Sequence, residues 1–268
     1  MNLYSFKACA FIGLTASCLS VSSAGAARSY TSDDIFLGFH QSGNTTRDYE
    51  INLGQAANFR DATTPFTLSI NIVQFNNDMA NAFGADWKSA NPAGGAIFWG
   101  VAGTTQNTAV AAPDNLTRLL YVSEPVGTTP VASSSQSTPA NNIIAFKNNF
   151  IDSPAPQGIV DGTVANSGIG DPTNSASWTS EVGNAAGPFG TGALVPLEDL
   201  LANNLDLFRV PQTTSGQPVT NEGRFSINLT TGAIAFTPTP EPSSVALLCG
   251  SLASLIGFQR IRRRAVRF

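Results

Sequence analysis

Short apolar runs, several of them alternating with polar residues, are spread along the middle of the chain and predict β-strands. Tyr49, Ile51 and Leu53 fall on one face of such a run, and residues 66–72 alternate in the same way, as half-buried strands do. The predicted strands are residues 34–39, 49–53, 66–72, 96–101 and 119–122.

The clearest pattern lies near the end of the chain. Residues 224–229 and 233–237 both alternate, and the turn Thr230-Thr231-Gly232 separates them. Two alternating runs around a glycine-containing turn predict a β-hairpin. The residues that follow are rich in proline, so we expect this hairpin to be the last element of the fold.

Helices are predicted in only two places. Asn76 is a possible cap for a helix over residues 77–83 that ends at Gly84. Residues 196–202 begin with a proline, carry acidic side chains in the first turn and have leucines at helical spacing. We expect residues 126–140 and 153–180 to be mainly surface loops. The whole pattern predicts a mainly β fold, an antiparallel β-sandwich-like single domain with a few short helices.

The first 26 residues have the features of a secretory signal peptide. Lys7 precedes a short apolar run, and the small residues Ala24 and Ala26 form a site suited to signal peptidase. We expect cleavage after Ala26. Two alternatives are a buried helix of the domain and a lipoprotein signal at Cys18, which lacks the expected aliphatic residue because Thr15 stands three positions before it.

The last thirty residues combine three features in a fixed order. Pro240-Glu241-Pro242 is followed by an apolar run of about sixteen residues, which spans about 24 Å as a helix, and then by basic residues. Four arginines, Arg260, Arg262, Arg263 and Arg264, would stay on the cytoplasmic side of a membrane. This tail resembles the PEP-CTERM sorting signal of Gram-negative bacteria, which implies processing by a membrane-embedded exosortase. An ordinary membrane anchor with a proline-rich linker is the alternative.

These features predict four segments. They are a signal peptide at 1–26, an exported all-β domain at 27–236, a proline-rich stalk at 237–243, and a transmembrane helix with a cytoplasmic tail at 244–268. We expect export across the inner membrane, transient anchoring through the C-terminal helix, and final residence in the cell envelope or outside the cell. The expected partners during export are signal peptidase and exosortase.

Composition narrows the function of the exported part. Between positions 27 and 240 the chain has eight Lys or Arg against seventeen Asp or Glu, a formal charge of −9, which disfavours binding to nucleic acid. The three cysteines, Cys9, Cys18 and Cys249, lie in the terminal apolar runs. The exported part therefore has neither disulfides nor a catalytic thiol.

Few residues suggest catalysis. His40 is the only histidine of the chain, and we expect it to lie at the surface; with no histidine or cysteine partners, a zinc site is not predicted. The carboxylate pairs Asp33-Asp34, Asp48 with Glu50, and Glu198-Asp199 are expected to be solvated, although two facing carboxylates would suit glycoside hydrolysis. No metal or cofactor is predicted.

Among the aromatic residues, Trp99 is expected in the core, whereas Trp178 lies among polar residues and is the best candidate for stacking on a sugar. Residues 34–39, 83–87, 98–104 and 205–209 also resemble segments of PEP-CTERM proteins from bacteria that produce exopolysaccharide. The expectation is therefore a non-enzymatic surface or extracellular-matrix protein associated with exopolysaccharide or biofilm. The alternative is a carbohydrate-binding or carbohydrate-active β-sandwich protein.

Overall fold

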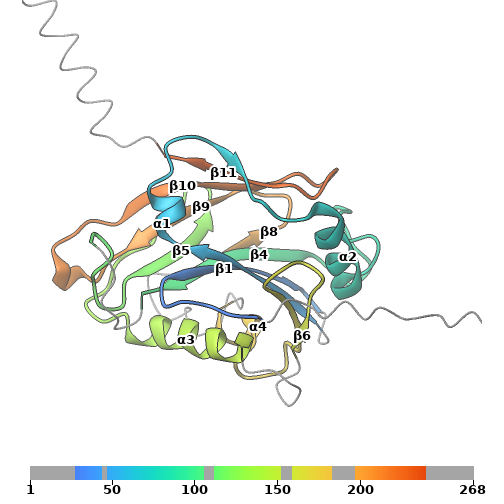
Figure 1. Ribbon diagram of the computed structural model, residues 1–268, viewed down its shortest axis with the longest axis horizontal. Helices are drawn as coiled ribbons and strands as arrows, with labels where there is room; N and C mark the ends of the chain where they lie inside the picture. Colours follow the sequence, from blue (N-terminus) through green and yellow to red (C-terminus); the bar gives the residue numbers. More distant parts are fainter. Residues whose placement is uncertain (1–27, 44–46, 106–111, 152–158, 183–196, 240–268) are drawn as a thin grey trace, which may run out of the picture.

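The computed structural model describes residues 28–43, 47–105, 112–151, 159–182 and 197–239, and these residues form a mainly antiparallel β fold (Figure 1). The strands are β1 (Asp34–Gln41), β2 (Asp48–Gln55), β3 (Phe66–Thr67), β4 (Ile97–Thr104), β5 (Leu120–Pro125), β6 (Val160–Asp161), β7 (Ser167–Gly170), β8 (Glu198–Leu200), β9 (Leu205–Val210), β10 (Thr220–Ile227) and β11 (Ile234–Pro238). The helices are α1 (Ala57–Arg60), α2 (Ile72–Phe83), α3 (Ser137–Ile151) and α4 (Trp178–Glu181), and a 3₁₀ turn covers Thr213–Ser215.

The described strands belong to one hydrogen-bonded sheet. Their order is β3-β11-β10-β9-β5-β4-β1-β2-β7-β6, and β8 pairs with β4 beside this path. The prediction of a mainly antiparallel β fold with a few short helices is thus confirmed. The sheet is continuous, in contrast to the two separate sheets of a β-sandwich, and it curves so that β9, β10 and β11 lie over β1 and β4 (Figure 1).

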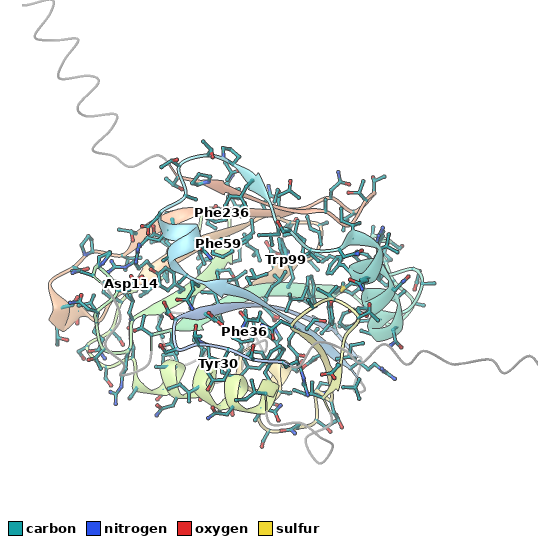
Figure 2. All side chains as sticks on the ribbon, in the orientation of Figure 1. Tyr30, Phe36, Phe59, Trp99, Asp114 and Phe236 are labelled. Atoms are coloured by element: carbon teal, nitrogen blue, oxygen red, sulfur yellow. The ribbon has the colours of Figure 1, made fainter. Side chains whose placement is uncertain are left out.

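The concave side of the curved sheet encloses the larger hydrophobic core. Phe225 of β10 and Phe236 of β11 lie 4.8 Å apart by ring centroids, and Phe59 of α1 packs against both of them. The same cluster contains Leu37 of β1 and Trp99 of β4, so it joins the β10–β11 end of the sheet to its central strands; Trp99, Phe59 and Phe236 are labelled in Figure 2. The expectation that Trp99 lies in the core is confirmed, because its side chain is fully buried.

The other face of β1 is covered by α3 and α4 (Figure 1). Phe36 packs edge-on against Phe146 and Phe150 of α3, at centroid distances of 5.3 and 5.0 Å. Alternate residues of β1 therefore enter two different cores, with Leu37 in one and Phe36 in the other. This explains why residues 35–39 carry no polar side chain, since a strand buried on both faces has no polar side.

The predicted terminal hairpin is confirmed. Strands β10 and β11 pair with Ile227 opposite Ile234, and Gly232 adopts a φ of +89° in the turn. The body ends slightly later than position 236, because Pro238 is part of β11 and the Thr239 N–H donates to the Glu222 carbonyl at 3.0 Å. The first residues expected in the stalk thus belong to the sheet.

Residues 66–72 were expected to form one strand, which is wrong beyond Thr67. The strand β3 contains only two residues, and α2 already begins at Ile72. The side chain of Asn71 accepts hydrogen bonds from the backbone of Val73 and Gln74, so Asn71 is the cap and not Asn76. The predicted end of this helix, Gly84, is confirmed.

The helix predicted over residues 196–202 is also wrong. Glu198, Asp199 and Leu200 form strand β8, which pairs with Phe98, Trp99 and Gly100 of β4. Strand pairing available in the folded chain overrides the local helical spacing of the leucines. Position 196 lies outside the described residues.

Two segments expected to be loops contain regular structure. Helix α3 begins at Ser137, inside the loop expected over 126–140, and its buried side chains Ala140, Ile143, Phe146 and Phe150 follow helical spacing. Strand β7 lies within 153–180, and helix α4 begins there and ends at Glu181. The period of α3 is visible in the sequence, so this helix was predictable.

Candidate functional site

A row of glycines and acidic residues crosses the face of the sheet that α4 covers. Gly168 of β7 pairs with Glu50 of β2, Glu50 pairs with Gly38 of β1, Gly38 pairs with Gly100 of β4, and Gly100 pairs with Glu198 of β8. The two central glycines leave a trough in this face, because no side chain rises from them. We refer to these five residues as the acidic trough.

The indole of Trp178 fills the acidic trough. A Cβ atom at Gly38 would lie only 2.0 Å from Cδ2 of this indole, so the ring rests directly on the strand backbone. The side chain of Trp178 is fully buried and packs edge-on against Phe146 of α3 at 5.4 Å. The expectation that Trp178 is exposed and free to stack on a sugar is therefore wrong.

Glu198 connects Trp178 with His40 at one end of the trough. The Trp178 Nε1–H donates to Glu198 Oε1 at 2.8 Å, and His40 Nδ1 lies 2.9 Å from Glu198 Oε2. Burial alone would lower the pKa of His40, but the hydrogen bond and charge of Glu198 outweigh it and the pKa is raised. Burial raises the pKa of Glu198, while His40 and Trp178 oppose that change.

Asp48 and Glu50 lie at the other end of the trough and are both fully buried. Asp48 accepts hydrogen bonds from the Thr179 N–H at 2.8 Å and the Thr179 hydroxyl at 2.6 Å. Both carboxylate oxygens of Glu50 lack a hydrogen-bond partner. Burial raises the pKa of Asp48 to about 6 and, together with the charge of Asp48, raises that of Glu50 well above its usual range.

The placement of these residues corrects three expectations. The pair Glu198-Asp199 was expected to be solvated, but only 7 % of the Glu198 side chain is exposed. His40 was expected at the surface, but only 17 % of its side chain is exposed. The pair Asp48 with Glu50 was expected to be solvated, and both residues are interior. Sequence alone gave no sign of this, because the helix that covers them comes more than a hundred residues later in the chain.

The trough contains groups used in acid–base catalysis, but its geometry does not suit a substrate. A catalytic histidine needs a nucleophile or a substrate proton within reach. Among the described residues, His40 has Glu198 as its polar partner and no hydroxyl in hydrogen-bond distance. The space between Glu50 and Glu198 is occupied by Trp178. Within the same part of the chain, no group of three or more His, Cys, Asp or Glu side chains is placed to hold a metal ion.

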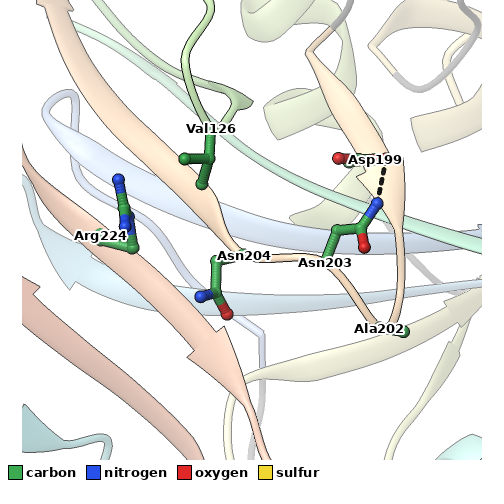
Figure 3. A pocket seen from close by; sticks show the side chains of 6 residues that line it. All are labelled: Val126, Asp199, Ala202, Asn203, Asn204 and Arg224. Atoms are coloured by element: carbon green, nitrogen blue, oxygen red, sulfur yellow. Dashed lines mark hydrogen bonds between the residues drawn. The ribbon is translucent and has the colours of Figure 1, made fainter.

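A second candidate site is an open pocket of about 400 Å³ beside the β8–β9 turn (Figure 3). It is lined by Val126, Asp199, Ala202, Asn203, Asn204 and Arg224. The Asn203 amide donates to Asp199 Oδ1 at 2.9 Å (Figure 3). Because neighbouring residues of a strand point to opposite faces, Glu198 enters the trough while Asp199 faces the pocket.

Arg224 is held in place at the pocket wall. Its Nε donates to Asp206 Oδ1 at 2.7 Å, and its Nη2 donates to Asp206 Oδ2 at 3.3 Å. This bidentate pairing fixes the plane of the guanidinium group and leaves Nη1 available to a ligand. Sequence analysis missed Arg224, Asn203 and Asn204, which carry no local motif; it selected Asp199 only as part of a carboxylate pair.

Glu124 lies in β5 directly opposite Asp206 of β9, two residues before Val126 of the pocket. It is almost completely buried, and neither of its carboxylate oxygens has a hydrogen-bond partner. Burial raises its pKa to about 8. Burial is the cause of this shift, and the carboxyl group of Asp206 across the strand pair is held by Arg224.

Other buried polar residues form structural networks. Asp114 accepts from the Tyr121 hydroxyl at 2.8 Å and pairs with both Arg60 and Arg209 (Figure 2). Asp78 accepts hydrogen bonds from the Thr163 backbone and hydroxyl, the Val164 N–H and the Tyr49 hydroxyl. These carboxylates are satisfied by the protein itself, so we assign them to stability.

The remaining predicted site residues lie outside the described residues. These are the sorting motif Pro240, Glu241 and Pro242 and the basic residues Arg260, Arg262, Arg263 and Arg264. The predicted signal peptide and transmembrane helix lie outside them as well. In the described ranges, no helix has both the length and the hydrophobicity needed to cross a bilayer. Comparisons of the chain with protein-family models, curated proteins and solved structures found no match.

Proposed function

We propose that the chain is a cell-envelope or extracellular-matrix protein whose exported β body is non-enzymatic. The single observation that carries this proposal is the occupied trough: the His40–Glu198 pair and the Glu50 carboxyl are sealed by Trp178. The groups that come closest to a catalytic set thus contribute to the interior of the protein.

The ends of the folded body support the proposed export and sorting. Arg28 Nε pairs with Asp161 at 3.0 Å, and the Ser29 N–H donates to Asn166 Oδ1 at 2.8 Å. The body is therefore engaged from the second residue after the proposed signal peptidase site at Ala26. At the other end, Thr239 is hydrogen-bonded to strand β10, and the Pro-Glu-Pro motif begins with the next residue. The two proposed sorting segments are therefore the sequence neighbours of the two ends of the described body.

In this proposal, signal peptidase removes residues 1–26 and an exosortase processes the tail near Glu241. The test is to express the protein, with an epitope on its tail, in a host that carries an exosortase. Immunoblotting then detects the tail in the membrane and released fractions. Glu241→Ala should be exported normally but accumulate as the full-length membrane form. Thr239→Ala is the matched control, because it changes a neighbouring residue and leaves the motif intact.

Neutralising Arg260, Arg262, Arg263 and Arg264 together should have a different effect. Without cytoplasmic charges nothing retains the end of the tail, so the tail should pass across the membrane. If Glu241→Ala is processed like the wild type, Pro-Glu-Pro is only a linker and the chain carries an ordinary anchor.

Carbohydrate binding is a second candidate function, and the open pocket favours it. Asp199, Asn204 and Arg224 place acceptors and donors around a concave surface, and the exposed face of Val126 supplies an apolar contact. Mixed polar groups beside a small apolar surface suit the hydroxyls and C–H groups of a sugar.

A glycan array probed with the exported protein tests the second function. Binding that is lost in Asp199→Ala and in Arg224→Ala, but retained in Asp33→Asn outside the pocket, would support it. Absence of binding to the array, or binding that is unaffected by the two pocket variants, would exclude carbohydrate binding at this pocket. The non-enzymatic envelope or matrix protein would then be the remaining proposal.

A further inference from the structure

The attachment of α4 to the sheet depends on buried carboxyl groups. Trp178 donates its indole N–H to Glu198, and Thr179 donates its backbone N–H and its hydroxyl to Asp48. The third carboxyl, Glu50, lies in the same trough, where neither oxygen has a partner at full hydrogen-bond geometry, although the Trp178 backbone N–H and the charge of Arg28 both favour its ionised form. Helix α4 has only four residues, so its own backbone hydrogen bonds contribute little to holding it in place.

We propose that Asp48, Glu50, Glu198 and His40 form a pH-responsive latch for α4. While these groups hold enough protons, Trp178 stays in the acidic trough. When the carboxyls become fully ionised, α4 lifts from the sheet and the trough opens to solvent. The latch is a property of the folded body and is independent of how the tail is processed.

The charges that face the latch do not balance when every carboxyl is ionised. Strand β2 contributes Asp48 and Glu50, β8 contributes Glu198, and β1 contributes His40, the only one of these four groups that can be positive. Three negative charges against at most one positive charge disfavour a closed, water-poor site.

The neighbouring elements supply less positive charge than the three carboxyls require. Arg28 of the N-terminal segment lies beside Gly168 and favours the ionised form of Glu50, but its Nε also pairs with Asp161 of β6 at 3.0 Å, which adds another carboxylate. Helix α3 packs against α4 through Phe146. Within the described part of the chain, the Lys147 amine of α3 donates hydrogen bonds to the carbonyls of Ser32 and Thr104 and to none of the trough carboxyls.

Other neighbours add no positive charge. Glu181 of α4 itself adds a further carboxyl, whose pKa burial raises. Strands β7 and β4 present only Gly168, Gly170 and Gly100 to the trough.

The direction of the pH effect follows from the sign of each shift. The pKa of Asp48, Glu50 and Glu198 is raised mainly by burial, and that of His40 is raised by Glu198. Burial by α4 therefore makes Asp48, Glu50 and Glu198 hold their protons more strongly when α4 is closed than when water reaches the trough, whereas burial alone acts on His40 in the opposite direction. Rising pH removes these protons and favours the open form, beginning near the pKa of Asp48 at about 6.

Hydrogen exchange measured by mass spectrometry on the exported protein between pH 5 and 9 tests the latch. After correction for intrinsic exchange rates, protection in peptides covering α4 should fall by up to about tenfold per pH unit for each proton released. Peptides from β1 and β4 should stay protected over the same range, because only α4 opens.

Glu50→Gln should flatten the pH dependence of α4 protection, since the amide keeps the shape of the side chain and cannot ionise. Asp48→Asn is the second variant, and it should flatten the part of the pH dependence of α4 protection that begins near pH 6. With two variants, a folding defect in one of them still leaves the other informative. Glu124→Gln is the matched control, because it neutralises a similar buried carboxyl on β5, which is outside the trough. The proposal is overturned if α4 and the sheet lose protection together, or if both trough variants titrate like the wild type.

Discussion

The Cα atom of Gly38 faces the indole of Trp178 so closely that a methyl group at this position would lie 2.0 Å from Cδ2. This contact joins the central strand β1 to helix α4, 140 residues later in the chain. The indole of Trp178 lies flat on the backbone of β1, in a position where aliphatic side chains usually cover a sheet. The packing of α4 therefore requires a glycine at position 38 and a large planar side chain at position 178.

We expect Gly38→Ala to lower the free energy of unfolding by about 1–3 kcal/mol, because the added methyl group forces Trp178 out of its position. Trp178→Ala should cost about 3–5 kcal/mol through the cavity it leaves. Urea denaturation followed by circular dichroism measures both values.

The double variant Gly38→Ala with Trp178→Ala tests whether the contact itself is responsible. Its loss of stability should be smaller than the sum of the two single losses, because the methyl group no longer meets an indole. Strict additivity would mean that Gly38 is needed for another reason, such as the conformation of β1.

Sequence patterns within a short window correctly predicted the elements that are formed by residues close together in the chain. The β10–β11 hairpin and the end of α2 at Gly84 were predicted from alternation and from turn or capping residues. Strand β8 was mistaken for a helix because its partner, β4, lies about a hundred residues earlier. Pairing at that distance leaves no signal in a short window.

The candidate site was harder to predict than the fold. Ser177 and Thr179 flank Trp178 and suggest exposure, yet Thr179 is a hydrogen-bond donor to a buried carboxylate and Ser177 caps α4. Polar neighbours indicate solvent only when they lack partners in the protein. Which polar residues have such partners is decided by tertiary structure, so the burial of Trp178 could not be inferred from sequence.

Replacing Glu124 by glutamine should change how stability depends on pH. The pKa of this carboxyl is raised by burial to about 8, whereas in the unfolded chain it has the ordinary value of a glutamate. The native state therefore binds more protons, and wild-type stability falls as pH rises from about 4.5 to 8.

The stability advantage of Glu124→Gln over the wild type should accordingly grow across this interval and stay constant above it, with a difference of a few degrees in Tm. Thermal scans at half-unit steps of pH measure it. A difference that does not vary with pH would show that Glu124 ionises normally in the folded protein.

Lys147 should have an effect of the opposite sign. Burial lowers the pKa of its amine to about 7, although the amine donates to the carbonyls of Ser32 at 3.1 Å and Thr104 at 3.3 Å. Between pH 7 and the ordinary lysine pKa of about 10.4, the unfolded chain binds the extra proton, so this group makes stability rise with pH.

Lys147→Met removes the titrating amine and keeps an unbranched apolar side chain in its place. Compared with the wild type, the variant should lack the gain in stability between pH 7 and 10, as followed by chemical denaturation at each pH. Identical slopes for the two proteins would show that the amine is charged in the native state throughout that range.

The last prediction concerns the start of the exported protein. Cleavage after Ala26 makes Arg28 the second residue, and its side chain is only 3 % exposed. Its Nε pairs with Asp161 at 3.0 Å, and its guanidinium carbon lies 5.6 Å from the centre of the Phe150 ring. A cut beyond residue 28 would remove a buried cation from its partner and open the packing against α3.

We therefore expect N-terminal sequencing of the envelope fraction to begin at Ala27. Arg28→Ala should be cleaved at the same bond but unfold at a lower temperature, because it removes the ion pair together with the contact to Phe150. Arg47→Ala provides a control with the same loss of charge outside this contact. A retained Met1 would exclude the signal peptide, and a start after Arg28 would mean that the ion pair with Asp161 is absent from the mature protein.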